Sequence, residues 1–293
     1  MLKFEKPQSV YEIGKIKLGG QPGENPTVLV GSIFYHGHKL MLDENAGKFD
    51  KEKAEGLIKL QEEFSDKTGN PCMLDVVGTT EQAMKTFISF VGDVTEKPFL
   101  IDSPSPSVRA VGAQYVKEVG LEERAVYNSL MPESKAEEFE SVKQSGLRSS
   151  ILLAYKGMLM TSEARVKAIK DLLPKVEEAG INKPLVDTCV LDVPSLAVGC
   201  RAILDLKAAT GFPCGCGAHN AISTWAGFKK RMGAEAFTPC AVSVNTMPIV
   251  LGADFVLYGP LEDCKYVFPA VNAINMAQKY LARMKEQVAF PIV

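Results

Sequence analysis

Five polar side chains end or closely follow short apolar stretches of the sequence, and these residue types are suited to recognising a ligand. They are three carboxylates and two amides: Asp75, Asp102, Asn128, Asp187 and Asn220. The clearest case is Pro98-Phe99-Leu100-Ile101-Asp102-Ser103, where apolar residues run directly into a carboxylate. A short, continuous apolar run is typical of a strand buried on both faces, as in parallel sheets. An acid at the C-terminal end of such a strand is placed where a ligand can meet it.

The chemistry of this set favours a flat heterocycle. Carboxylates only accept hydrogen bonds, whereas amides both donate and accept them. The 2-amino-4-oxo pyrimidine of a pterin has several N–H donors and a few acceptors along its edges, so it suits such a ring of side chains. Two alternatives stay open: the carboxylates bind Mg²⁺ or another hard cation, or individual members cap the helices that follow. No predicted strand ends in lysine, which argues against Schiff-base chemistry, and no nucleophile elbow for acyl transfer is present.

A second group, Cys214-x-Cys216-x-x-His219, has spacing that resembles thiolate zinc ligation. The alternation of a strand puts both cysteines on the same side. Small cysteines in a glycine-rich strand are also common core residues, so the spacing leaves both interpretations open. His36 and His38 are spaced as metal ligands can be, but we expect them to lie in a solvated lid.

The elements that must position these residues alternate between strand and helix. Eight apolar segments are typical of strands: 28–34, 72–77, 99–102, 125–128, 150–155, 185–187, 212–217 and 254–258. Helical patterns follow them, beginning with residues 51–67 after the N-cap Asp50 and ending with residues 261–285. Sequential strand–helix repetition requires parallel strands. The pattern predicts the α/β class and a (β/α)8 TIM barrel, because an open doubly wound sheet would need a glycine-rich phosphate turn after the first strand.

Two segments stand outside this repetition. Residues 1–26 are predicted to form an N-terminal β-hairpin and turn, with strands at 9–13 and 16–18 that plug the bottom of the barrel. The first strand is followed by an unusually long polar loop, residues 35–50, which we expect to gate access to the mouth. We treat residues 1–293 as a single TIM-barrel domain.

Composition excludes several classes of function. The chain of 293 residues is 46% hydrophobic and has a formal net charge of −2, with no basic cluster, so nothing favours binding to nucleic acid. The N-terminus lacks the apolar core of a signal peptide. Asn245, Pro248 and Asp254 interrupt the most apolar window, so no membrane insertion is predicted. Seven cysteines in apolar segments favour free thiols in a reducing, cytoplasmic location.

Several motifs resemble a known family. They are Leu18-Gly19-Gly20-Gln21-Pro22-Gly23-Glu24, Gly31-Ser32-Ile33-Phe34-Tyr35, Thr68-Gly69-Asn70-Pro71, Val126-Tyr127-Asn128-Ser129 and Asp254-Phe255-Val256-Leu257-Tyr258-Gly259-Pro260, together with the segment ending in Asp102. They resemble the H subunit of tetrahydromethanopterin S-methyltransferase and the bacterial tetrahydrofolate methyltransferases of glycine betaine and related demethylation pathways. The resemblance covers nearly the whole chain, although Cys214 and Cys216 depart from the family pattern.

The resemblance implies a barrel that moves a methyl group between N5 of a reduced pterin and the cobalt of a corrinoid carried by a partner protein. In pterin-binding barrels, the positions of Asp102, Asn128 and Asp187 hold the pterin edge. The position of Asn220 lies near N5 and is the predicted catalytic residue, and Asp75 is a further expected binding residue. These barrels need no metal for the transfer.

The leading prediction is therefore a corrinoid protein:tetrahydrofolate methyltransferase, an enzyme of one-carbon metabolism. Its cofactors are tetrahydrofolate, as methyl acceptor or donor, and the corrinoid of its partner, and the family resemblance implies a homodimer. Tetrahydromethanopterin-dependent transfer to or from a corrinoid subunit is the second hypothesis. A non-catalytic, pterin-binding docking subunit and a metal-dependent hydrolase are the third and fourth.

Overall fold

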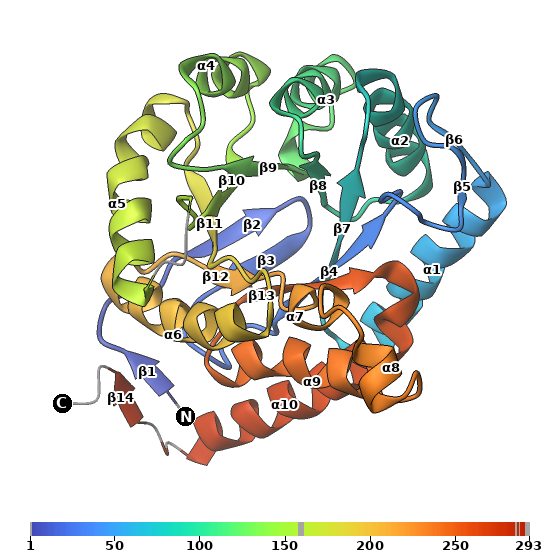
Figure 1. Ribbon diagram of the computed structural model, residues 1–293. Helices are drawn as coiled ribbons and strands as arrows, with labels where there is room; N and C mark the ends of the chain where they lie inside the picture. Colours follow the sequence, from blue (N-terminus) through green and yellow to red (C-terminus); the bar gives the residue numbers. More distant parts are fainter. Residues whose placement is uncertain (1, 158–160, 285, 287, 291–293) are drawn as a thin grey trace.

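A computed structural model describes residues 2–157, 161–284, 286 and 288–290 of the chain. Its centre is a closed barrel of eight parallel strands in the order β10-β11-β12-β13-β4-β7-β8-β9, surrounded by helices (Figure 1). The barrel strands are β4 (Val28–Ile33), β7 (Cys72–Val77), β8 (Phe99–Asp102), β9 (Ala125–Leu130), β10 (Ser149–Leu153), β11 (Lys183–Asp187), β12 (Cys214–Cys216) and β13 (Phe255–Pro260). The predicted (β/α)8 TIM barrel is confirmed.

Helices follow each barrel strand and cover the outside of the sheet. They are α1 (Lys51–Thr68), α2 (Glu81–Val94), α3 (Pro106–Glu118), α4 (Ala136–Ser145), α5 (Ser162–Glu178), α6 (Val193–Thr210), α7 (Asn220–Ser223), α8 (Phe228–Met232), α9 (Phe237–Val250) and α10 (Cys264–Met284), with short 3₁₀ turns at Glu122–Arg124 and Leu261–Asp263. The predicted N-cap is confirmed, because the Asp50 side chain accepts from the Lys53 N–H. Lys285, the predicted end of the last helix, lies outside the described residues.

One connection differs from the sequence pattern. Trp225 and Phe228 predict a single helix between the last two strands, but the chain forms α7, α8 and α9 there. Glycines at 227 and 233, both with positive φ, flank α8 and separate it from its neighbours. Trp225 lies between α7 and α8, and its ring meets that of Phe228 edge to face.

The N-terminal hairpin closes one end of the barrel. Strands β2 (Val10–Ile13) and β3 (Ile16–Gly19) pair antiparallel, as the sequence predicts. Ile13, Ile16 and Leu18 are buried in one cluster with residues of the barrel interior: Val28, Val30, Met73, Leu100, Val126, Ile151, Leu185 and Phe255. Figure 1 shows the hairpin crossing the space inside the ring of strands. The interior is therefore a packed apolar core at this end.

The two ends of the chain lie side by side. Strand β1 (Leu2–Phe4) pairs in parallel with β14 (Val288–Phe290), and Figure 1 places both below the barrel near α10. A further small hairpin, β5 (Met41–Asp43) and β6 (Lys48–Phe49), lies within the long first loop. No helix in the described ranges has the length and hydropathy needed to cross a bilayer.

Candidate functional site

The strand register brings the predicted residues to one end of the barrel. Asp102 is the register partner of Asn128 on β9 and of Val77 on β7, and Asp187 is the partner of Leu153 on β10. Asp75 lies two residues before Val77. Because the strands are parallel, all these side chains belong to the C-terminal ends, the end opposite the hairpin and the usual location of ligand sites in this fold.

A cavity of about 380 Å³ opens at this mouth. Its lining consists of Ser32, Tyr35, Asp75, Val77, Asp102, Asp187, Gly217, His219, Asn220, Ser223, Leu257, Gly259 and Pro260. Four of the five predicted residues are therefore in its wall. The fifth, Asn128, contacts that wall, because its Nδ2 donates to Asp75 Oδ1 over 3.4 Å. The structure thus brings together the set that the sequence suggests.

The carboxylates are held by uncharged donors. The hydroxyl of Ser32 donates to Asp75 Oδ2 over 2.7 Å, and the Cys189 N–H donates to Asp187 Oδ1 over 2.7 Å. In the described part of the chain, Asp75, Asp102 and Asp187 form no ion pair with lysine, arginine or histidine. Each has acceptor capacity left for a ligand that brings N–H donors.

Burial makes ionisation of these groups costly. It raises the pKa of Asp75 to about 6, against hydrogen bonds from Ser32 and Asn128 that lower it. Burial likewise raises the pKa of Asp187 to about 6. The pKa of Asp102 is also raised well above its ordinary value, first by burial and then by the nearby charge of Asp75. Three acids with raised pKa values in one cavity are typical of a functional site rather than of a structural network.

Two buried arginines lie on the helices that cover the barrel, next to the strand ends that carry Asp102 and Asp187. Arg109 on α3 donates to the carbonyl of Ser103, the residue after Asp102, and pairs with Glu138. Arg165 on α5 donates to the carbonyls of Thr188 and Cys189, the two residues after Asp187. Each guanidinium lowers the pKa of the carboxylate whose strand end it holds, which offsets part of the effect of burial. They fix the backbone at the points where the acids leave the sheet.

Asn220, the predicted catalytic residue, begins α7 and is exposed at the cavity. Its Nδ2 donates to the carbonyl of Val190 over 3.0 Å. A carbonyl only accepts, so this bond assigns the orientation of the amide and leaves Oδ1 available as an acceptor. The sequence allows an amide that rotates to serve either direction of transfer. In the structure, Oδ1 is the amide atom that stays available to a hydrogen-bond donor.

The cysteine–histidine group is divided between two environments. Cys214 and Cys216 are fully buried in the core between the barrel and its helices, whereas His219 lines the mouth. No cluster of three or more metal-ligating side chains occurs in the described ranges. Alternation along β12 does place both thiols on one side, but that side faces the core and not the cavity, which favours the interpretation of the cysteines as core residues.

The two histidines of the first loop differ from each other. His36 is exposed and its Nδ1 lies 2.7 Å from Glu44. His38 is buried, contrary to the prediction of a solvated lid: the Phe34 N–H donates to its Nδ1, and its Nε2 lies 3.1 Å from Glu262. His38 stacks on Tyr35, whose ring is in the cavity wall. This histidine anchors the start of the loop to the barrel.

The sequence does not single out Ser32, Tyr35, Arg109 or Arg165. Ser32 and Tyr35 lie at the end of the first strand in the motif Gly31-Ser32-Ile33-Phe34-Tyr35, so their position was a usable signal. The arginines lie on helices among apolar residues of the buried face. A charge on such a face indicates a buried partner, but the sequence does not say which one.

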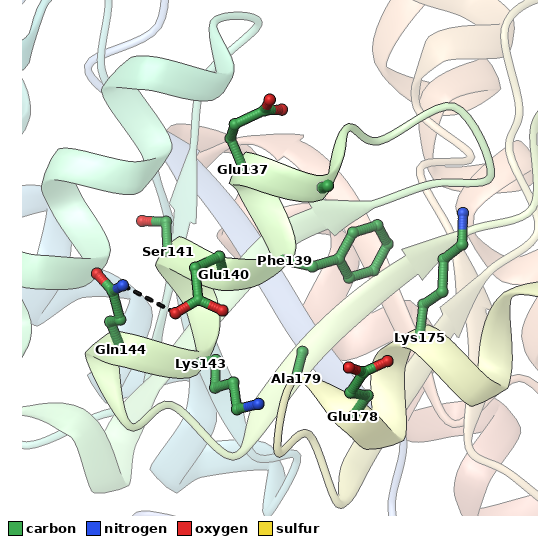
Figure 2. A pocket seen from close by; sticks show the side chains of 10 residues that line it. Glu137, Phe139, Glu140, Ser141, Lys143, Gln144, Lys175, Glu178 and Ala179 are labelled. Carbon is green, nitrogen blue, oxygen red and sulfur yellow. Dashed lines mark hydrogen bonds between the residues drawn. The ribbon is translucent and has the colours of Figure 1, made fainter.

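A larger hollow of about 620 Å³ lies elsewhere, between α4 and α5 on the outer surface (Figure 2). Figure 2 shows Phe139 in it together with charged side chains, among them Glu140, Lys175 and Glu178. The single hydrogen bond among the residues drawn there joins Gln144 to Glu140. The groove is lined mainly by charged surface side chains of two neighbouring helices. The smaller mouth cavity, with its buried acids, is the better candidate site.

Comparisons with known proteins identify the family of the chain. The family model of the tetrahydromethanopterin S-methyltransferase MtrH subunit matches residues 6–290. The H subunit of that enzyme from Methanothermobacter thermautotrophicus is 44% identical over 281 residues, covering 92% of this chain and 91% of the relative. The H subunit of the putative methyltransferase mtx of Methanosarcina acetivorans is 39% identical over 291 residues, covering 95% and 94%.

Solved structures give the fold independently. A Yersinia pestis dihydropteroate synthase bound to a pterine-sulfa conjugate superposes with a TM-score of 0.62 at 12% identity, covering 92% of this chain and all of that one. The 7,8-dihydropteroate synthase of Vibrio fischeri superposes with a TM-score of 0.64 at 11% identity, covering 95% and 99%. At these identities the likeness establishes a shared barrel architecture.

Proposed function

Because the chain belongs to the family of the tetrahydromethanopterin S-methyltransferase MtrH subunit, we propose that it moves a methyl group between N5 of a reduced pterin, bound at the barrel mouth, and the cobalt of a corrinoid on a separate protein. One observation carries the proposal: Asp75, Asp102 and Asp187 line one cavity, and none forms a direct ion pair among the described residues. Such acids need a ligand rich in N–H donors, and the pyrimidine edge of a pterin supplies them.

The raised pKa values support this interpretation of the acids. A carboxylic acid that is costly to ionise when the cavity contains only protein becomes easier to ionise once N–H donors approach it. Asn128 is already committed to Asp75, so we expect it to orient that acid as well as to touch the ligand edge. A divalent cation would also ionise the acids, but the described ranges contain no cluster of metal-ligating side chains.

Methyl transfer between nitrogen and cobalt is an in-line displacement at carbon, so the protein acts mainly by orientation. The acids fix the pterin edge in the mouth. Asn220 Oδ1 accepts from N5 when that nitrogen carries a proton. The open mouth leaves room for a partner protein to present its corrinoid, and the relatives are themselves named as subunits, which is consistent with a multi-protein reaction.

The identity of the pterin is the finer question. The leading prediction made from the family resemblance is tetrahydrofolate, with tetrahydromethanopterin second. The relatives at 44% and 43% identity are named for tetrahydromethanopterin, so that pterin has the stronger support. The mouth acids are expected to bind the pyrimidine edge, which is the same in both pterins. These acids therefore give no selectivity between tetrahydrofolate and tetrahydromethanopterin. Homodimer formation and a cytoplasmic location stay predictions.

The direct test mixes the protein with a methyl-corrinoid partner and either tetrahydropterin, and follows the visible spectrum of the methyl-cobalt species. We expect its absorbance to fall with tetrahydromethanopterin, and a similar rate with tetrahydrofolate would restore the sequence prediction. No change with either acceptor, in a partner preparation proven active, would leave a non-catalytic docking subunit as the better description.

A further inference from the structure

His219 lies at the mouth and has no assigned role. It follows β12 by three residues, immediately precedes Asn220, and lines the same cavity as Asp75, Asp102 and Asp187. Its imidazole packs against Gly259, where a Cβ would come within 2.4 Å of the ring. Gly259 also has φ +96°, so the backbone and the ring together require glycine there. The imidazole is thus held firmly in the cavity wall.

The hydrogen bonding of this ring is incomplete. Its Nδ1 is buried and has no partner among the described residues. Buried polar atoms in proteins almost always have a partner, and exceptions often mark groups that act on a ligand. His38 shows the contrast, because its two nitrogens are both engaged, by Phe34 and Glu262. His38 is a structural histidine. In His219 the buried Nδ1 lies against Gly259, so Nε2, which forms no hydrogen bond among the described residues, is the nitrogen that a ligand in the cavity can reach.

The proposed reaction needs a proton carrier that Asn220 cannot provide. When a methyl group moves to the pterin, the N5 lone pair attacks the methyl carbon, the carbon–cobalt bond breaks with its electron pair staying on cobalt, and the N5 proton must leave. In the reverse direction, the carbon–nitrogen bond breaks with its pair on N5, which must take up a proton. An amide only accepts or donates hydrogen bonds under these conditions, but an imidazole exchanges protons near neutral pH.

We propose that His219 is a further catalytic residue of this site, exchanging the N5 proton with the pterin during methyl transfer. The inference rests on the proposed function and deepens it. The other titratable groups in the cavity wall are Tyr35, Asp75, Asp102 and Asp187. The acids are the expected partners of the pterin edge, and burial raises the pKa of Tyr35 to about 12, so that phenol keeps its proton.

The surroundings of His219 set the preferred direction. Burial lowers its pKa below the ordinary value of histidine, so the ring is neutral at pH 7 and ready to take a proton. A neutral imidazole assists transfer to the pterin, which releases a proton. Transfer from the methyl-pterin needs the imidazolium, so that direction should become faster as the pH falls through the pKa of His219.

The first test uses the small number of histidines. The chain has only His36, His38 and His219, so protein labelled with ¹⁵N-histidine gives three imidazole spin systems in a long-range ¹H–¹⁵N spectrum. We expect the resonance that disappears in His219→Gln to titrate below the ordinary range and to move when tetrahydromethanopterin is added. A His219 resonance that is unchanged by a saturating pterin would overturn the proposal without affecting the proposed function.

The second test measures turnover. His219→Gln should lower the rate of methyl transfer to the pterin at pH 7 by about 100-fold, the usual scale for a lost acid–base group, and remove one ionisation from the pH profile. The dissociation constant of the pterin should change by less than about threefold. Glu140→Gln, in the outer groove away from the mouth, is the control and should leave the rate unchanged. A rate for His219→Gln within twofold of the wild type, in a chain with unchanged melting temperature, would contradict the proposal.

Discussion

The two ends of the barrel differ in how their carboxylates are hydrogen-bonded: by a charged partner at the closed end and by uncharged donors at the mouth. At the closed end, Lys207 Nζ lies 2.7 and 2.6 Å from the two carboxylate oxygens of Asp254, and it also donates to the Gly20 carbonyl. The same acid accepts from the Cys214 N–H. At the mouth, the donors to Asp75 and Asp187 among the described residues are uncharged. At the closed end the carboxylate has its counter-charge, whereas the mouth carboxylates keep unused acceptor atoms that a ligand can bind.

This difference separates stability from function in one fold. The paired charge and the apolar plug hold the hairpin on the barrel, and nothing in them is left for a ligand. The mouth instead keeps three acids whose ionisation opposes folding. Proteins commonly retain such a cost where binding requires it. Substitutions at the two ends should therefore have opposite effects on the free energy of unfolding.

The largest decrease in the free energy of unfolding is expected for a substitution at the closed end. Lys207→Met leaves the buried Asp254 without its counter-charge, and it should lower the free energy of unfolding by about 3–5 kcal/mol in a urea titration. The matched control is Lys167→Met, which breaks the exposed pair with Asp171 and should change it by less than about 1 kcal/mol. Equal effects of the two variants would remove the distinction between buried and exposed pairs.

The second largest decrease is expected for the buried side chains of the N-terminal hairpin. Leu18 is fully buried against the inward-facing residues of the barrel, so Leu18→Ala should cost about 2–5 kcal/mol in the same titration. Val10 on the same hairpin is exposed, and Val10→Ala should stay within about 0.5 kcal/mol of the wild type. A small loss from Leu18→Ala would mean that the hairpin is not part of the folding core.

At the mouth, a substitution should raise the free energy of unfolding instead of lowering it. Asp102→Asn removes a half-buried acid whose pKa is raised, so the ligand-free protein should become more stable at pH 7 by about 0.5–2 kcal/mol. Asp254→Asn, the comparable change at the closed end, should instead destabilise the protein. Destabilisation by both variants would show that Asp102 is a structural residue like Asp254.

The smallest effect is a pH dependence with a defined sign. The pKa of Asp187 is about 6 in the folded chain and near 3.8 when unfolded, so the unfolded state ionises more readily and folding is penalised at neutral pH. The free energy of unfolding of the ligand-free protein should therefore rise by about 1 kcal/mol per such acid as the pH falls from 7 to 5. Asp187→Asn should remove its share of that rise, and an unchanged slope would contradict the shift.

The sequence predicts the barrel because most strands are short apolar runs and most helices have a regular apolar stripe. It also predicts that polar residues lie at or near the C-terminal ends of the strands, and therefore most of the mouth, although several strands end one or two residues away from the predicted position. The burial of His38 and the orientation of Asn220 were not predictable, since both depend on partners, Glu262 and Val190, that are distant in sequence. The division of residues 220–250 into three helices was missed because the apolar residues there have no single helical period.

The central claim is that the mouth acids bind a reduced pterin. Equilibrium binding of tetrahydromethanopterin should be measured by calorimetry on the wild type, on Asp102→Asn and on Glu140→Gln, which changes the outer groove of Figure 2. We expect Asp102→Asn to weaken binding by about 10–100-fold, the scale of one lost charged hydrogen bond, and Glu140→Gln to leave it unchanged. Equal affinity of all three proteins would contradict the account.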